Sequence, residues 1–218
     1  MLITFDLDDT LYLERDFVYS GFDAVGEYLQ KTLHISNFSS EARQVFLSGR
    51  RRGIFDRVFI KLGVSVGQNL IDECVEIYRE HRPSLNLEGL VHEILEGLRP
   101  DHTLALVTDG FPRSQRNKIA ALGIESQLDL IIVTGEHGVP WTKPSPLAFQ
   151  QLERETGFSE GNCVYIGDNP TKDFGGPSLL GWQVLRLRPA GGIYCHLDTP
   201  VGIPEISFLG DFGSVLHL

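Results

Sequence analysis

Polar residues directly follow short apolar runs at several places along the chain. Asp6 and Asp8 come after the first run, Thr108 and Asp109 end the second, and Gly167-Asp168 ends a later one. Carboxylates that gather at one point repel one another unless a cation neutralises them. Ligation by oxygen atoms alone selects a hard ion such as Mg²⁺. The residue types therefore predict a magnesium site, provided that the fold brings these segments together.

A lysine and a hydroxyl group could hold an anion beside such a site. Lys143 lies in the loop after a further apolar run, and Thr108 offers a hydroxyl donor. A metal ion, an ammonium group, a hydroxyl and a free carboxylate together suit phosphoryl transfer. In that reaction, stabilisation of the charge on the equatorial phosphoryl oxygens provides most of the catalysis.

The apolar runs predict the strands that must position these residues. They cover residues 2–5, 103–107, 130–134, 163–166 and 183–187. Continuous rather than alternating apolar runs are typical of a parallel sheet covered by helices on both faces. Helical patterns lie between them: Ser114 is predicted to cap one helix that ends at Gly123, and Pro146 lies near the start of another that ends at Gly157. This alternation predicts a doubly wound α/β fold, whose strands all end at one ligand-binding edge.

The connection between the first and second predicted strands is far longer than the later ones. Apolar residues recur in it at helical spacing, among them Phe17, Phe22, Val25, Tyr28 and Leu29. We therefore expect an all-helical domain over residues 14–86, inserted into a catalytic core made of residues 1–13 and 87–218.

The composition narrows the possible partners. The chain has 218 residues and a formal net charge of −10, which disfavours nucleic acid and anionic membranes. Charged or polar residues break every apolar run well short of a membrane span. The cysteines Cys74, Cys163 and Cys195 match neither a disulfide framework nor a zinc pattern, and they favour a reducing, cytoplasmic location.

The order and spacing of the polar residues resemble a known superfamily. The segment Asp6–Thr10 is similar to the first motif of the haloacid dehalogenase-like hydrolases, Thr108 to the second, Lys143 to the third and Gly167–Asp173 to the fourth. The inserted segment 14–86 is similar to the helical cap domain of the first subclass. The resemblance implies a Rossmann-like core and, with the carboxylate at Asp8, the phosphatase branch.

The resemblance also implies roles for the acidic residues. Asp6 would attack phosphorus and form an aspartyl-phosphate, and Asp8 would act as general acid and then as general base. Mg²⁺ would be held by the Asp6 carboxylate, the main-chain carbonyl of Asp8 and Asp168. Asp173 is either an outer metal ligand or an acceptor for Lys143 or a metal-bound water.

The phosphoryl oxygens would be held by the hydroxyl, ammonium and main-chain N–H groups of the same motifs. Thr108 and Lys143 would bind them, helped by the N–H groups of Leu7 and Asp109. An asparagine often stands where this chain has Asp109, so the Asp109 side chain could contact a substrate hydroxyl or serve only the turn before Gly110.

Several alternatives remain open at the level of sequence. The partner implied is a small phosphorylated metabolite, either a nucleotide or a sugar or acid phosphate. A sugar phosphomutase and a haloacid dehalogenase share the superfamily, and a receiver-like signalling module also forms an aspartyl-phosphate. The run Arg50-Arg51-Arg52 could hold a second anionic group of a substrate or form a solvated helix face. Nothing in the sequence indicates an oligomeric state.

Overall fold

The computed structural model describes residues 1–216 of the chain. Its contacts separate two compact units. One comprises Met1–Glu14 together with the chain from Asn86 on, and the other comprises Arg15–Leu85. We call them the core unit and the helical unit. Within residues 1–216, no helix is long and apolar enough to cross a membrane.

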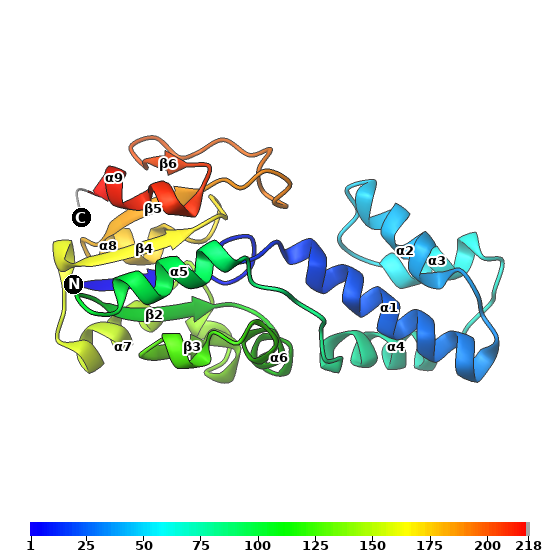
Figure 1. Ribbon diagram of the computed structural model, residues 1–218. Coiled ribbons are helices and arrows are strands. Elements are labelled where there is room, and N and C mark those ends of the chain that lie inside the picture. Colours follow the sequence, from blue (N-terminus) through cyan, green and yellow to red (C-terminus); the bar gives the residue numbers. More distant parts are fainter. Residues whose placement is uncertain (217–218) are drawn as a thin grey trace. The chain divides into compact units, whose positions relative to one another are not determined.

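A parallel sheet forms the centre of the core unit (Figure 1). Within the described residues its strands are β1 (Leu2–Phe5), β2 (Thr103–Thr108), β3 (Leu130–Val133), β4 (Cys163–Gly167), β5 (Gln183–Leu187) and β6 (Glu205–Ile206). They are arranged in the order β3-β2-β1-β4-β5-β6, and every neighbouring pair is parallel. The first strand in the sequence therefore lies inside the sheet, and the prediction of a doubly wound α/β fold is confirmed.

The predicted strands differ from the observed ones only at their ends. Strands β2 and β4 each continue one residue further than predicted, to Thr108 and Gly167. Strand β3 stops at Val133, because Thr134 begins a short 3₁₀ helix. Strand β6 was not predicted, since two residues are too few to produce an apolar pattern.

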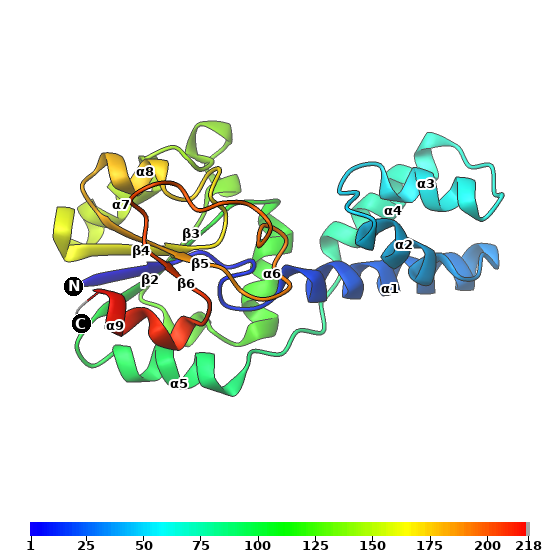
Figure 2. The same cartoon turned by 90° about the horizontal axis from the view of Figure 1, so that it is seen from above.

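Helices cover both faces of the sheet. They are α5 (Gly89–Leu98), α6 (Pro112–Leu122), α7 (Leu147–Thr156), α8 (Gly175–Leu179) and α9 (Phe212–Leu216). Figure 2 shows α7 and α8 on one face, and α5 and α9 on the other. Under α7, the buried side chains of Phe149 and Leu152 pack against Tyr165 of β4 and Ala105 of β2. Continuous burial on both faces explains why the strands read as uninterrupted apolar runs.

The start of α6 corrects one prediction. Ser114 does not cap this helix but lies inside it and is buried. The helix begins at Pro112, whose fixed φ and missing N–H suit the first helical position. It ends as predicted at Gly123, which adopts a left-handed conformation with φ 68°.

Four helices make up the described helical unit, and the first of them begins at Glu14, the last residue of the preceding core segment. They are α1 (Glu14–Leu33), α2 (Phe38–Leu47), α3 (Ile54–Lys61) and α4 (Gln68–Glu80). Phe22 lies at the centre of their aromatic core, and its ring centroid is 6.2 Å from those of Phe46 and Phe55 and 6.0 Å from that of Tyr78. The aromatic residues that recur at helical spacing thus hold this unit together.

Candidate active site

The polar residues of the motifs lie where the central strands end. Strand β1 ends at Phe5, which is in register with Leu106 of β2 and Ile166 of β4. The next residue, Asp6, still donates its N–H to the Ile166 carbonyl oxygen at 2.8 Å. Asp168 directly follows β4, so segments that are distant in sequence meet at the carboxyl edge of the sheet.

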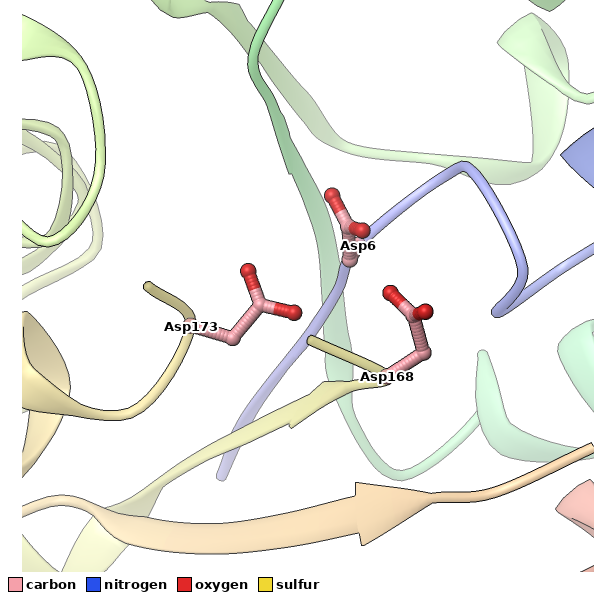
Figure 3. Close-up of side chains that lie close together, drawn as sticks. All are labelled: Asp6, Asp168 and Asp173. Carbon is pink, nitrogen blue, oxygen red and sulfur yellow. The ribbon is translucent and has the colours of Figure 1, made fainter. Parts of the chain in front are cut away.

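A cluster of buried carboxylates occupies this edge (Figure 3). One ligand oxygen from each of Asp6, Asp168 and Asp173 lies within 4.8 Å of the others. Gly167 allows this approach, because a Cβ atom at this residue would lie 2.6 Å from Oδ2 of Asp173. The glycine of the Gly-Asp step therefore makes room for the third carboxylate.

Burial and the neighbouring charges shift the pKa values of Asp6 and Asp168. Burial raises the pKa of Asp6 to about 6; Lys143 opposes this shift and Asp173 adds to it. Burial, followed by the charges of Asp6 and Asp173, raises the pKa of Asp168 to about 9. In the absence of a cation, the ionised forms of Asp6 and Asp168 are thus less favourable than those of exposed carboxylates.

Lys143 is the buried counter-charge of the cluster. Its Nζ donates to Asp6 Oδ1 at 2.7 Å and to the Tyr165 hydroxyl at 2.8 Å, and it lies 2.8 Å from Asp173 Oδ1. Burial disfavours the charged amine, but the charges of Asp173 and Asp6 raise the pKa of Lys143 well above its ordinary value. Asp173 therefore contacts Lys143 and also faces the carboxylate cluster, so both roles considered for it are compatible with its position.

The donor set of the cluster fits Mg²⁺. Its atoms are carboxylate oxygens, which hard divalent ions prefer. A bound cation would offset both the burial and the mutual repulsion that raise the pKa values of Asp6 and Asp168. The Asp8 side chain lies outside this cluster, so the contribution expected from Asp8 is its main-chain carbonyl alone.

The side chain of Asp8 is held by helix α6 and by Tyr12. Lys118 Nζ lies 2.8 Å from both carboxylate oxygens, and Gln115 Nε2 donates to Oδ2 at 3.1 Å. The Tyr12 hydroxyl donates to Oδ1. Burial opposes ionisation, but Lys118 and the hydrogen bonds lower the pKa of Asp8 below its ordinary value. Asp8 is therefore a carboxylate at neutral pH in this arrangement.

Sequence reasoning missed Lys118 and Gln115. They are three residues apart on α6 and so share one face of the helix. Both are buried. The sequence did contain one signal, because a lysine lies beside apolar residues in the helix after the second motif. However, neither Lys118 nor Gln115 belongs to a motif.

The Asp109 side chain connects three loops of the site. Its Oδ1 accepts from the Thr134 hydroxyl at 2.7 Å and from the Lys143 N–H at 3.2 Å, and its Oδ2 lies 3.3 Å from Lys172 Nζ. Burial opposes ionisation, but Lys143 and Lys172 lower the pKa of Asp109. The Asp109 side chain thus forms its contacts with other residues of the protein. The preceding residue, Thr108, is buried at the end of β2.

Sequence comparison assigns the family of the chain. A family model for haloacid dehalogenase-like hydrolases matches residues 3–185. The chain belongs to this family.

Curated relatives of this hydrolase are phosphatases. Phosphoserine phosphatase of Thermus thermophilus is 34% identical over 126 residues, which cover 56% of this chain and 46% of that protein. N-acylneuraminate-9-phosphatase of Rattus norvegicus is 33% identical over 60% of this chain and 53% of its own length. The match thus spans about half the length of these two relatives. Glyceraldehyde 3-phosphate phosphatase of Methanocaldococcus jannaschii is 27% identical, over 85% of this chain and 83% of that protein.

Solved structures of the family share the fold of this hydrolase. The HAD-hydrolase YfnB of Bacillus subtilis, bound to magnesium, aligns with a TM-score of 0.69 and 20% identity, covering 100% of this chain and 98% of that one. The 2-haloacid dehalogenase of Pseudomonas syringae pv. tomato aligns with a TM-score of 0.67 and 24% identity, covering 99% of this chain and 97% of that one. The same fold therefore occurs in proteins named for different reactions, and fold alone does not select the substrate.

The arginine run lies in the helical unit of this hydrolase. The Arg51 guanidinium lies 4.0 Å from the centroid of the Phe46 ring and donates to the Phe46 carbonyl oxygen at 2.7 Å. All three arginines are exposed, and Arg51 is the one with these two contacts. Because Arg51 contacts Phe46 within its own unit, Arg50 and Arg52 are the remaining candidates for binding an anion.

Replacing Asp168 with asparagine is expected to stabilise the metal-free enzyme increasingly as the pH rises. The folded-state pKa of Asp168 is about 9, above the ordinary value of 3.8. The stability linked to its protonation is complete below pH 4 and is lost as the pH rises toward 9. In the presence of chelator, Asp168→Asn should therefore have a higher Tm than the unmodified enzyme, and the difference should increase from about pH 5 to about pH 9. A constant difference across this range would contradict the raised pKa of Asp168.

Proposed function

We propose that this hydrolase is a Mg²⁺-dependent phosphatase that cleaves small phosphomonoesters through an aspartyl-phosphate on Asp6. One observation carries the proposal: Asp6 and Asp8, two residues apart, face different surroundings. Asp6 lies in the carboxylate cluster beside Lys143, whereas Asp8 is held by Lys118. Such a division suits a nucleophile and a separate acid–base group. The phosphatases among its relatives support the same reaction class.

In the first step, Asp6 would act as the nucleophile. A carboxylate oxygen of Asp6 attacks phosphorus, the bond from phosphorus to the ester oxygen breaks, and Asp8 delivers a proton to the leaving oxygen. The product is an alcohol and an aspartyl-phosphate. This step requires the protonated form of Asp8, which the contact with Lys118 disfavours.

In the second step, Asp8 would act as the base. It accepts a proton from water, the water oxygen bonds to phosphorus, and the bond from phosphorus to Asp6 breaks. Inorganic phosphate leaves, and the Asp6 carboxylate is restored. The ionised form that Lys118, Tyr12 and Gln115 favour is the form that this step needs.

Other residues of the site would hold the phosphoryl group. The Thr108 hydroxyl, the Lys143 ammonium and the N–H groups of Leu7 and Asp109 are the proposed donors to its oxygens. Asp6, the main-chain carbonyl of Asp8, and Asp168 would hold Mg²⁺, and Asp173 would serve either as an outer ligand or as the acceptor for Lys143 or a metal-bound water. When bound, the ion supplies positive charge that offsets the charge developing on the phosphoryl oxygens.

The helical unit is proposed to act as the cap over the substrate. We assign residues 14–86 to the cap and residues 1–13 and 87–218 to the catalytic core. Closure of such a domain excludes bulk water and adds contacts to the leaving group. A cytoplasmic location is also proposed, supported by the free thiols of Cys74, Cys163 and Cys195.

Purified enzyme is expected to release phosphate from a panel of small phosphomonoesters in the presence of Mg²⁺. The panel should contain nucleotides, sugar phosphates and phosphorylated acids, with free phosphate as the readout. EDTA should stop the reaction and Mg²⁺ should restore it. Ca²⁺ should not, because its looser coordination can capture a carboxylate that is needed for attack.

The same assay separates the alternatives. Full activity on a haloacid in the presence of EDTA would indicate a dehalogenase and contradict the proposal. Interconversion of sugar phosphate isomers without net phosphate release would indicate a mutase.

A further inference from the structure

Helix α6 presents buried polar side chains toward the loop that carries Asp8. Gln115 and Lys118 lie on one face of this helix and are only 2% and 4% exposed. Gly110 precedes the helix with φ 144°, and a Cβ atom there would lie 2.6 Å from Gln115 Nε2. The local backbone therefore leaves room for the Gln115 amide to donate both to the Asp109 carbonyl oxygen and to Asp8 Oδ2.

The contact between Lys118 and Asp8 is symmetric. Nζ lies 2.8 Å from Oδ1 and 2.8 Å from Oδ2. Two equal contacts to one ammonium fix the direction of the carboxylate, and Tyr12 and Gln115 each hold one of its oxygens. The side chain of Lys118 is 5% exposed and that of Asp8 is 18% exposed. Because a buried charge is unfavourable without a partner, the ammonium and the carboxylate hold one another in place.

The pair of Lys118 and Asp8 resembles the pair that Lys143 forms with Asp6. Lys143 Nζ lies 2.7 Å from Asp6 Oδ1 and also contacts Asp173. Lys118 comes from a different element and contacts the other aspartate of the same loop. Each of the two aspartates thus has its own buried ammonium group, and only Lys143 belongs to a motif.

Building on the proposed function, we propose that Lys118 is a positioning residue that orients the Asp8 carboxylate for hydrolysis of the aspartyl-phosphate. In that step, Asp8 removes a proton from water while the water oxygen bonds to phosphorus and the bond from phosphorus to Asp6 breaks. Lys118 acts through Asp8, so its loss should slow this step more than the attack by Asp6.

Rapid-mixing kinetics with dinitrophenyl phosphate separate the two steps, because this leaving group departs without a proton. Lys118→Met should release a burst of dinitrophenolate equal to the enzyme present, at a rate little changed from that of the unmodified enzyme. The following steady state should be slower by about 10²-fold, the scale of lost general-base help. Intact mass of the quenched protein should show accumulated phospho-enzyme. Lys118→Arg, which keeps the charge, should recover part of the steady-state rate.

Lys31→Met is the matched control, since Lys31 forms an exposed ion pair with Glu27 on α1, and its kinetics should equal those of the unmodified enzyme. If Lys118→Met does not fold, Lys118→Gln, which keeps a hydrogen-bond donor, gives the same comparison. A parallel fall of burst and steady state would indicate a merely structural role and overturn the inference, and so would unchanged kinetics in both phases. If instead the unmodified enzyme releases no phosphate from any ester, the proposed function itself is wrong.

Discussion

Asp6→Asn is expected to lower kcat by about 10⁶-fold, the scale observed when a covalent nucleophile is removed from other hydrolases. An amide oxygen is a poor nucleophile, and the substitution also removes one carboxylate from the cluster. Phosphate release from the best substrate of the panel measures the effect. No phospho-enzyme should form, in contrast to Lys118→Met.

The same substitution should leave the fold intact. The pKa of Asp6 is raised to about 6, so the ionised side chain is unfavourable at neutral pH. A neutral amide removes this penalty, and the Tm of Asp6→Asn in chelator should equal or exceed that of the unmodified enzyme. Asp101→Asn, at an exposed position, is the control and should keep full activity. Substantial turnover by folded Asp6→Asn would refute the nucleophilic role.

Lys143→Met is expected to cause the largest loss of stability among these variants. Lys143 is fully buried and contacts Asp6 and Asp173, so its removal leaves their charges without the ammonium. Loss of one partner of a buried ion pair costs about 3–5 kcal/mol. Denaturant unfolding in chelator should show this decrease in the free energy of unfolding. Activity should also fall, because Lys143 is proposed to bind the phosphoryl oxygens.

The destabilisation should depend on pH in a defined direction. Protonation can neutralise Asp6 below about pH 6, because its pKa is raised. Lys143→Met should therefore lose more stability at pH 8 than at pH 5. Lys61→Met removes a lysine from a partly exposed pair with Glu41, and its effect should stay below about 1 kcal/mol. Equal effects of the two substitutions would mean that Lys143 is not the main counter-charge.

The strands and the residues at their ends could be predicted from the sequence because the relevant signals are local. Apolar runs located β1 to β5, and the acidic and hydroxyl residues directly after them were the ones that met at the sheet edge. Parallel strands bring their carboxyl ends to the same edge, so the convergence of Asp6, Thr108 and Asp168 followed from topology alone. Apart from the two-residue strand β6, which was not predicted, the errors in the strands and in helix α6 concerned element ends. At Ser114, for example, the proline at the first helical position determined the start of the helix instead.

The partners of the acidic side chains required the tertiary structure. Asp8 and Lys118 are 110 residues apart in sequence, and no periodic pattern relates them. Asp173 can approach the cluster only because Gly167 lacks a Cβ atom. The contacts of the Asp109 side chain became known only when the structure placed Thr134 and Lys172 beside it.

The sequence by itself thus determined which residues could do chemistry and the edge of the sheet at which they meet. Only the tertiary structure decided how their charges are paired, because burial and the distances between charges set the pKa of each group, and both depend on packing across the whole core.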